Sequence, residues 1–234
     1  MTATAMDTPA AVLWDMDGTL VDTEPYWIET EFALAERFGG TWSEAHALSL
    51  VGNDLMVSAR FIRDHMPLDL PPEQIVDLLL DGVVERVRRS VPWCAGAREQ
   101  LLALAAAGVP CALVTMSWTR FVAPILDQLP EGTFATVVTG DHVTHGKPHP
   151  EPYLTAAERL GVDPTACLAV EDSATGASSA EAAGCQVLVV PNHVEVPPGE
   201  RRVFAPSLAG LDLAEVWAGA RAGNRATSRR AVGS

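Results

Sequence analysis

The chain has 234 residues, 48% of them hydrophobic and 20% charged, which is enough for one large globular domain or for a core with a modest insert. Its formal net charge of −14 argues against a nucleic-acid partner, because proteins that bind nucleic acids need a positive surface. An anionic substrate would have to be held by local cations or by a metal ion.

The first predicted element is a strand over residues 11–14, a short apolar run that ends at Asp15. Residues 23–93 then show helical periodicity without any strand pattern; Pro25 suits the first turn of one helix and Pro72 opens another. An insert at this point would lie above the strand ends, where open α/β sheets bind ligands. We therefore predict an all-helical cap over residues 23–93.

The rest of the chain alternates between two kinds of segment. Apolar runs typical of buried parallel strands cover residues 111–115, 136–139, 167–170 and 187–190. Helical periodicity before and between them covers residues 97–107, 119–129, 151–160 and 175–183. The alternation predicts an α/β fold with a doubly wound, Rossmann-like parallel sheet. The catalytic core would comprise residues 9–22 and 94–218.

The last predicted segment, residues 219–234, is rich in Ala, Gly, Ser and Arg. Its arginines have no acidic partner within the segment, and their spacing makes only a weak patch for anions or membranes. We predict a disordered tail.

Cysteine usage and the absence of targeting signals indicate a compartment. None of the four cysteines forms a CxxC pair, and three lie in apolar runs, as is typical of core residues in a reducing environment. The N-terminal residues lack the pattern of a secretory signal, and no apolar run is long enough to cross a bilayer. We expect a cytoplasmic protein with no membrane partner, a monomer, with a dimer left open.

Acidic residues follow two of the predicted strands directly. Asp15 and Asp17 come after the first strand, and Glu171 and Asp172 come after the strand at residues 167–170. In a parallel sheet both pairs would project from the same edge. Clustered carboxylates repel one another unless a cation is present, and oxygen ligands without histidine favour Mg²⁺. One acidic pair alone would more simply cap a helix or lie on a solvated loop.

Two further residues suit phosphate oxygens at the same edge. Thr115 ends another predicted strand and offers a hydroxyl, while Lys147 in Gly146-Lys147-Pro148 offers an ammonium group. Gly18, in the turn after Asp17, would let a phosphate approach the main-chain N–H groups. The convergence of these groups with two acidic pairs favours a site over independent helix caps.

The motifs resemble those of a known superfamily. The order Asp-Met-Asp-Gly-Thr-Leu-Val-Asp-Thr, Val-Thr, Gly-Lys-Pro-His-Pro and Val-Glu-Asp-Ser is similar to the four motifs of haloacid dehalogenase-like proteins. The closer resemblance is to the branch of phosphatases and β-phosphoglucomutase-like enzymes, which carry a helical cap after the first motif. It covers residues 11–217.

The resemblance implies a role for each acidic residue. Asp15 matches the nucleophile that forms an aspartyl-phosphate and contributes to the metal site. Asp17 matches the general acid and base, and its backbone carbonyl is a Mg²⁺ ligand in this family. Asp172 matches the remaining protein carboxylate on the metal, with Glu171 close by.

The resemblance also implies a phosphate-binding set. Thr115 and Lys147 match the pair that holds the phosphate. Met116 stands where relatives more often have a small or polar residue, and its backbone N–H would bind phosphate. Ser117 would compensate for the missing side-chain hydrogen bond.

These roles predict a Mg²⁺-dependent phosphatase acting on a small phosphorylated metabolite, a sugar phosphate or a similar monoester. A β-phosphoglucomutase-type isomerase would use the same core, and the sequence does not separate the two. A non-enzymatic phospho-accepting domain would be about half this length and would need no cap. A phosphonate hydrolase would require a lysine in the cap, and residues 23–93 contain none.

Three cap residues could contact the substrate: Asn53, Arg60 and Arg63. For the arginines, an exposed charge on a helix surface is the simpler interpretation.

His142, His145 and His149 suggest a zinc site. The sequence shows no fourth ligand, and we interpret them as ordinary loop histidines.

Overall fold

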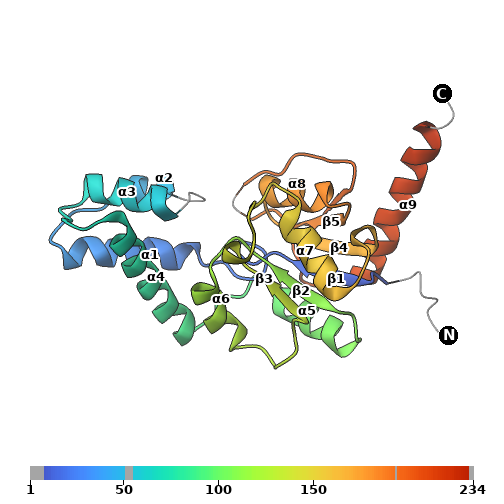
Figure 1. Cartoon of the computed structure of the whole chain (residues 1–234), viewed down its shortest axis with the longest axis horizontal. Helices are drawn as coiled ribbons and strands as arrows, with labels where there is room; N and C mark the ends of the chain where they lie inside the picture. Colours follow the sequence, from blue (N-terminus) through green and yellow to red (C-terminus); the bar gives the residue numbers. More distant parts are fainter. Residues whose placement is uncertain (1–7, 51–54, 193, 232–234) are drawn as a thin grey trace. The chain divides into compact units, whose positions relative to one another are not determined.

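The computed structural model describes residues 8–50, 55–192 and 194–231. The chain divides into two compact units. The first unit comprises Met1–Asp22, Trp93–Val122 and Leu129–Ser234, and the second comprises Thr23–Pro92 and Ala123–Gln128. The parallel sheet lies in the first unit, and the part of the second unit that the structure describes is helical. Figure 1 shows the elements of both units.

The described residues of the first unit form a six-stranded sheet in the order β3-β2-β1-β4-β5-β6, with every neighbouring pair parallel. The predicted α/β fold with a parallel sheet is confirmed. Its strands are β1 (Ala11–Trp14), β2 (Cys111–Val114), β3 (Thr136–Val138), β4 (Cys167–Glu171), β5 (Gln186–Val189) and β6 (Arg202–Phe204). The central neighbours β1 and β4 are the strands that each precede an acidic pair. Their pairing therefore brings the two acidic pairs to one edge.

Helices cover both faces of the sheet, as Figure 1 shows. Helices α7 (Glu151–Leu160) and α8 (Ala174–Ala182) pack against each other and against the central strands. Helix α5 (Ala97–Ala106) contacts β2, and α9 (Leu213–Ala231) contacts β5 and β6. The first unit also contains the beginning of α6 (Thr119–Leu126), whose residues from Ala123 on belong to the second unit, and the short 3₁₀ turns Gly140–His142 and Pro164–Ala166.

Small side chains line the face of the sheet that α7 and α8 cover. Ala11 and Ala169 of two neighbouring strands lie in one buried cluster with Ala156 of α7 and Ala177 of α8. Successive strand side chains point to opposite faces, so the large ring of Trp14 belongs to the other side. The alanines let α7 lie close to the sheet, and this helix carries a residue of the site described below.

The second unit is built around helix α4 (Pro72–Arg89), which packs on α1 (Glu24–Arg37) and α3 (Leu55–His65). Its apolar residues recur with helical spacing and are buried. Helix α2 (Glu44–Leu50) and residues 123–128, which include the end of α6, complete the described part of the unit. The predicted helical insertion after the first strand is confirmed, and Asn53 lies outside the described residues.

The C-terminal segment requires a correction. A disordered tail was predicted from residue 219, but α9 continues to Ala231. Its first turns are tied down because Leu213, Trp217 and Ala220 are buried. Alanine and arginine have high helix propensity, so the same composition that looked low in complexity also sustains a helix. No helix among the described residues combines the length and apolar character needed to span a membrane.

Candidate active site

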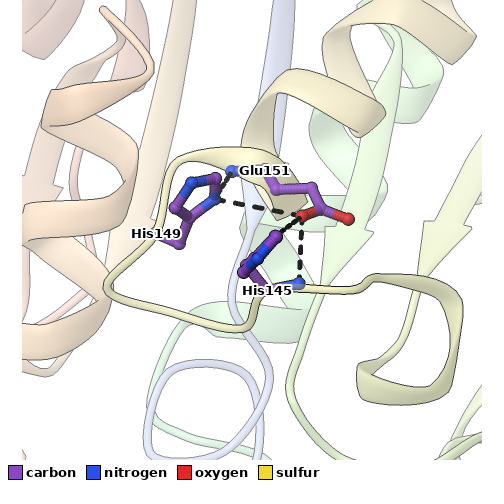
Figure 2. A group of neighbouring side chains, drawn as sticks. All are labelled: His145, His149 and Glu151. Carbon is purple, nitrogen blue, oxygen red and sulfur yellow. Dashed lines mark hydrogen bonds and ion pairs between the residues drawn. The ribbon is translucent and has the colours of Figure 1, made fainter.

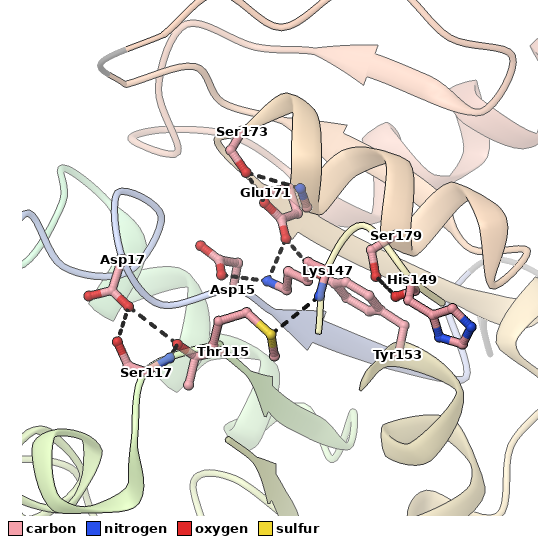
Figure 3. A network of polar contacts seen from close by, with 12 residues as sticks. Asp15, Asp17, Thr115, Ser117, Lys147, His149, Tyr153, Glu171, Ser173 and Ser179 are labelled. Carbon is pink, nitrogen blue, oxygen red and sulfur yellow. Dashed lines mark hydrogen bonds and ion pairs between the residues drawn. The ribbon is translucent and has the colours of Figure 1, made fainter. Parts of the chain in front are cut away.

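Four segments from the first unit meet at the carboxyl edge of the sheet, as Figure 3 shows. Asp15 follows β1, and its N–H donates to the carbonyl of Val170 in β4 at 3.0 Å. Thr115 follows β2, and its N–H donates to the carbonyl of Val138 at 2.9 Å. Backbone hydrogen bonds of the sheet therefore fix where both side chains begin.

The turn after Asp17 depends on a glycine. Gly18 has φ +84°, a left-handed conformation that other residues rarely adopt. A Cβ atom at this position would lie 2.1 Å from Oδ2 of Asp172. Glycine therefore allows both the turn and the close approach of the second acidic pair.

Lys147 bridges the two acidic strand ends. Its Nζ lies 2.6 Å from Oδ1 of Asp15 and 2.7 Å from Oε1 of Glu171, and its side chain is 6% exposed. Burial alone would lower the pKa of Lys147, but the adjacent Asp15 and Glu171 carboxylates raise it above its usual value. The ammonium group therefore stays charged. It is the only lysine in the chain.

Glu171 is held from several sides. Besides Lys147, the hydroxyl of Tyr153 donates to its Oε1 at 2.6 Å, and Oγ of Ser173 donates to Oε2 at 3.3 Å. Burial, and then the charge of Glu171, raise the pKa of Tyr153 well above normal, so the phenol remains a donor. A Cβ atom on Gly176 would lie 2.0 Å from Oε1 of Glu171. Glu171 therefore positions the lysine.

Three buried carboxylates could hold a metal ion. Asp15, Glu171 and Asp172 each offer one oxygen, and these oxygens lie within 4.8 Å of one another. Burial, followed by the charges of Asp15 and Glu171, raises the pKa of Asp172 to about 8. One ammonium group does not offset three clustered carboxylates, so a divalent cation with a preference for oxygen ligands fits this site.

Asp17 has a separate environment. Its Oδ2 accepts hydrogen bonds from Oγ of Ser117 at 2.7 Å and from Oγ1 of Thr115 at 3.2 Å. Burial, and secondarily the charge of Asp15, raise the pKa of Asp17 to about 6. The Asp17 carboxylate does not belong to the three-carboxylate cluster. The structure thus separates two neighbouring aspartates into different electrostatic settings.

Met116 contacts the segment that carries Lys147. Its Sδ accepts a hydrogen bond from the Lys147 N–H at 3.3 Å, and a Cβ atom on Gly146 would lie 2.8 Å from this sulfur. The Met116 side chain therefore packs against the loop that carries Lys147. Its sulfur is a polarisable acceptor that fits an irregular space.

The two cap arginines lie on α3 of the second unit. Arg60 is exposed, and Arg63 pairs with the exposed Asp64 at 3.2 Å. Both therefore have the surroundings of surface charges.

Comparison with known proteins shows the family. The model of the haloacid dehalogenase-like hydrolases matches residues 12–190. Hexitol phosphatase B of Escherichia coli (strain K12) is 30% identical over 194 residues, covering 80% of this chain and 86% of the relative. Phosphoglycolate phosphatase of the same strain is 36% identical over 200 residues, covering 74% and 78%.

A solved structure agrees with this relationship. The crystal structure of CbbY from Rhodobacter sphaeroides in complex with phosphate is 26% identical, with a TM-score of 0.75, and the match covers 87% of this chain and 96% of that one. The fold and the family match define a hydrolase with a Rossmann-like core and an inserted helical cap. The chain belongs to the haloacid dehalogenase-like hydrolases, in the branch of β-phosphoglucomutase-like and phosphoglycolate phosphatase-like enzymes, so the resemblance found in the sequence is confirmed.

Proposed function

We propose that this protein is a Mg²⁺-dependent phosphatase that hydrolyses a small phosphate monoester through an aspartyl-phosphate on Asp15. The observation that carries the proposal is the contact between Lys147 and Asp15, at 2.6 Å, at the edge where the Asp172 carboxylate also lies. A buried ammonium group beside a buried carboxylate can offset the negative charge of a phosphoryl group as it approaches.

Asp15 would attack phosphorus, and the bond between phosphorus and the ester oxygen would break. Asp17 would give its proton to the leaving oxygen in this step. A water molecule would then attack the aspartyl-phosphate, Asp17 would take the proton from that water, and the bond between phosphorus and Asp15 would break. A pKa of about 6 suits a residue that must act as acid and then as base near neutral pH.

Mg²⁺ would be held by Asp15 and Asp172, together with the backbone carbonyl of Asp17. When bound, it would supply positive charge to the transferring phosphoryl group. Glu171 would act through Lys147, since its oxygens are engaged by that lysine, Tyr153 and Ser173.

The backbone N–H groups that follow β2, including that of Met116, would complete the phosphate site. The hydroxyl of Thr115 would contribute once a phosphate replaces part of its contact with Asp17.

Similar proteins support the substrate class. The named relatives are a hexitol phosphatase and a phosphoglycolate phosphatase, and the similar CbbY structure contains phosphate. We infer a small phosphorylated sugar, sugar alcohol or hydroxy acid as the substrate.

We also infer a monomer that acts in the cytoplasm. All four cysteines are free thiols, which suits a reducing compartment.

The test is a screen of sugar phosphates, hexitol phosphates and phosphoglycolate against metal-free protein, with and without added Mg²⁺. We expect release of inorganic phosphate that depends on Mg²⁺ and is lost in Asp15→Asn. The matched control is Glu158→Gln, which removes an exposed carboxylate on α7. Isomerisation of a sugar phosphate without net phosphate release would favour the mutase instead. Equal activity in Asp15→Asn and the parent would refute the mechanism.

A further inference from the structure

A second group of ligand-type side chains lies outside the active site, at the beginning of α7. It consists of His145, His149 and Glu151, as Figure 2 shows. The side chains are 62%, 51% and 26% exposed, so a solvated ion could reach them. The group contains two imidazoles, unlike the active site, whose clustered ligands are all carboxylates.

The three donor groups already converge. Nδ1 of His145 lies 2.8 Å from Oε2 of Glu151, and Nδ1 of His149 lies 3.9 Å from the same oxygen. One ligand atom from each residue falls within 4.8 Å of the others. Ligands at zinc distances in a tetrahedron are about 3.4 Å apart, so the observed separations bracket the required value.

Backbone contacts hold the carboxylate in place. The Thr144 N–H donates to Oε1 of Glu151 at 2.6 Å, and the His145 N–H donates to Oε2 at 2.9 Å. These two backbone hydrogen bonds fix the orientation of the carboxylate before any ion arrives.

The His149 ring has a defined orientation as well. The Glu151 N–H donates to Nδ1 of His149 at 3.2 Å, which indicates that this nitrogen carries a lone pair. The two imidazole rings lie 4.7 Å apart with a tilt of 36°. An ion would replace the hydrogen bond between Nδ1 of His145 and Oε2 of Glu151, and also the hydrogen bond that Nδ1 of His149 accepts. The backbone would keep its position.

We propose that His145, His149 and Glu151 form a surface site for Zn²⁺ or a similar late first-row divalent ion. Two imidazole nitrogens and one carboxylate suit such ions, whereas Mg²⁺ prefers oxygen ligands. Three protein ligands would leave a fourth position for water. The proposal goes beyond the phosphatase function and does not depend on it.

The structure also explains why the sequence did not reveal this site. His142 seemed the natural third ligand, but its Nδ1 accepts a hydrogen bond from the Thr139 N–H at 3.4 Å and is not part of the group. Glu151 takes its place. Gly146, Lys147 and Pro148 lie between the two histidines, so a bound ion would tie both ends of the catalytic lysine segment to the start of α7.

The test uses the full-length, metal-free protein in excess Mg²⁺, which would compete for the oxygen-only site. Zn²⁺ would be titrated against a chromophoric chelator. We expect one equivalent to bind the parent and the affinity to fall at least about 10-fold in His145→Gln and in His149→Gln. The matched control, His142→Gln, removes a histidine of the same loop and should bind like the parent.

Two further measurements distinguish the loss of the site from misfolding of a variant and from Zn²⁺ binding elsewhere on the protein. Without zinc, the parent and each histidine variant should unfold at the same temperature, and added Zn²⁺ should raise this temperature only in the parent and in His142→Gln. Bound Co²⁺ should give the visible absorption of a four-coordinate ion in the parent. The two ligand variants, His145→Gln and His149→Gln, should not show it. Unchanged Zn²⁺ affinity in both ligand variants, or an affinity lost equally in His142→Gln, would overturn the proposal.

Discussion

Tyr153 of α7 and Glu171 of β4 share a hydrogen bond of 2.6 Å, and the same Glu171 oxygen accepts from Lys147 at 2.7 Å. A buried phenol therefore fixes the carboxylate that fixes the lysine. Lys147 has this support on one side and Asp15 on the other. Its position is determined by two strands and one helix, although it lies in a loop.

We predict that Lys147→Met lowers kcat by about 10²–10³-fold, because the transferring phosphoryl group loses a preorganised cation. Stability should also fall by about 3–5 kcal/mol, since Asp15 and Glu171 are left buried without a counter-charge. Lys147→Arg keeps the charge and should retain more stability than activity. Steady-state kinetics and urea unfolding measure both effects. Arg88→Met, on the exposed surface of α4, is the control; parent-like kinetics in Lys147→Met would contradict the proposed role.

Asp17 should give opposite pH dependences in the two half-reactions. Its pKa of about 6 means that the protonated form is lost as pH rises through that value. Formation of the phosphoenzyme needs the acid and should slow above about pH 6, whereas its hydrolysis needs the base and should slow below. Rapid-quench, single-turnover measurements separate the steps. Asp17→Asn should slow both by about 10²–10⁴-fold and remove both dependences. Pre-steady-state rates in Asp17→Asn that still follow the parent profile would assign the titration to another group.

Gly18→Ala should be far more harmful than a glycine substitution at a similar φ. The added Cβ would collide with Asp172, whereas at Gly161, with φ +68°, no atom lies within 4 Å of it. Gly161→Ala should therefore cost only the left-handed strain, about 1–2 kcal/mol, and keep full activity. Gly18→Ala should lose more stability and nearly all Mg²⁺-dependent turnover. Calorimetry and phosphate release on both variants test this, and equal behaviour of the two would show that the contact with Asp172 is unimportant.

Glu31 should make the second unit less stable as pH rises. It is buried and accepts a hydrogen bond from Nε1 of Trp42 at 3.0 Å, and burial is the main reason that its pKa rises from 4.5 to about 7. The folded state then binds a proton that the unfolded state has released, so stability falls between about pH 4.5 and 7. Glu31→Gln should remove this loss and gain at most about 3 kcal/mol at pH 8.

Urea unfolding of the parent and of Glu31→Gln at pH 5 and pH 8 measures the difference. Glu36→Gln, an exposed carboxylate on the same helix, serves as the control and should follow the parent. A pH dependence that is the same in Glu31→Gln and the parent would place the titrating group elsewhere.

The strands of the sheet were predicted from apolar runs in the sequence. A strand without such a run therefore could not be predicted. Strand β6 (Arg202–Phe204) was missed because it is a short edge strand with partly exposed side chains and an arginine. The approach of Asp15 to Asp172 follows from the position of each at a strand end, which the sequence does show. The order of the strands in the sheet depends on the topology of the chain, which the apolar runs do not reveal.

The contacts that hold the side chains of the site in place could not be predicted from the sequence. Tyr153 lies in an ordinary amphipathic pattern, and nothing in its neighbours indicates that its hydroxyl reaches Glu171. For Met116 the sequence showed only a residue type that differs from the small or polar residue more often found in relatives. Its contact with the Lys147 N–H depends on how two loops approach each other, which no local pattern encodes.

The single lysine of this chain has a practical consequence. Reagents that acylate lysine side chains have one target, and that target is 6% exposed between two carboxylates. The rate at which such a label accumulates on Lys147 would count the moments when this edge of the sheet opens to solvent. A phosphate mimic that binds at this edge should slow the labelling, so the labelling rate would report whether the site is occupied.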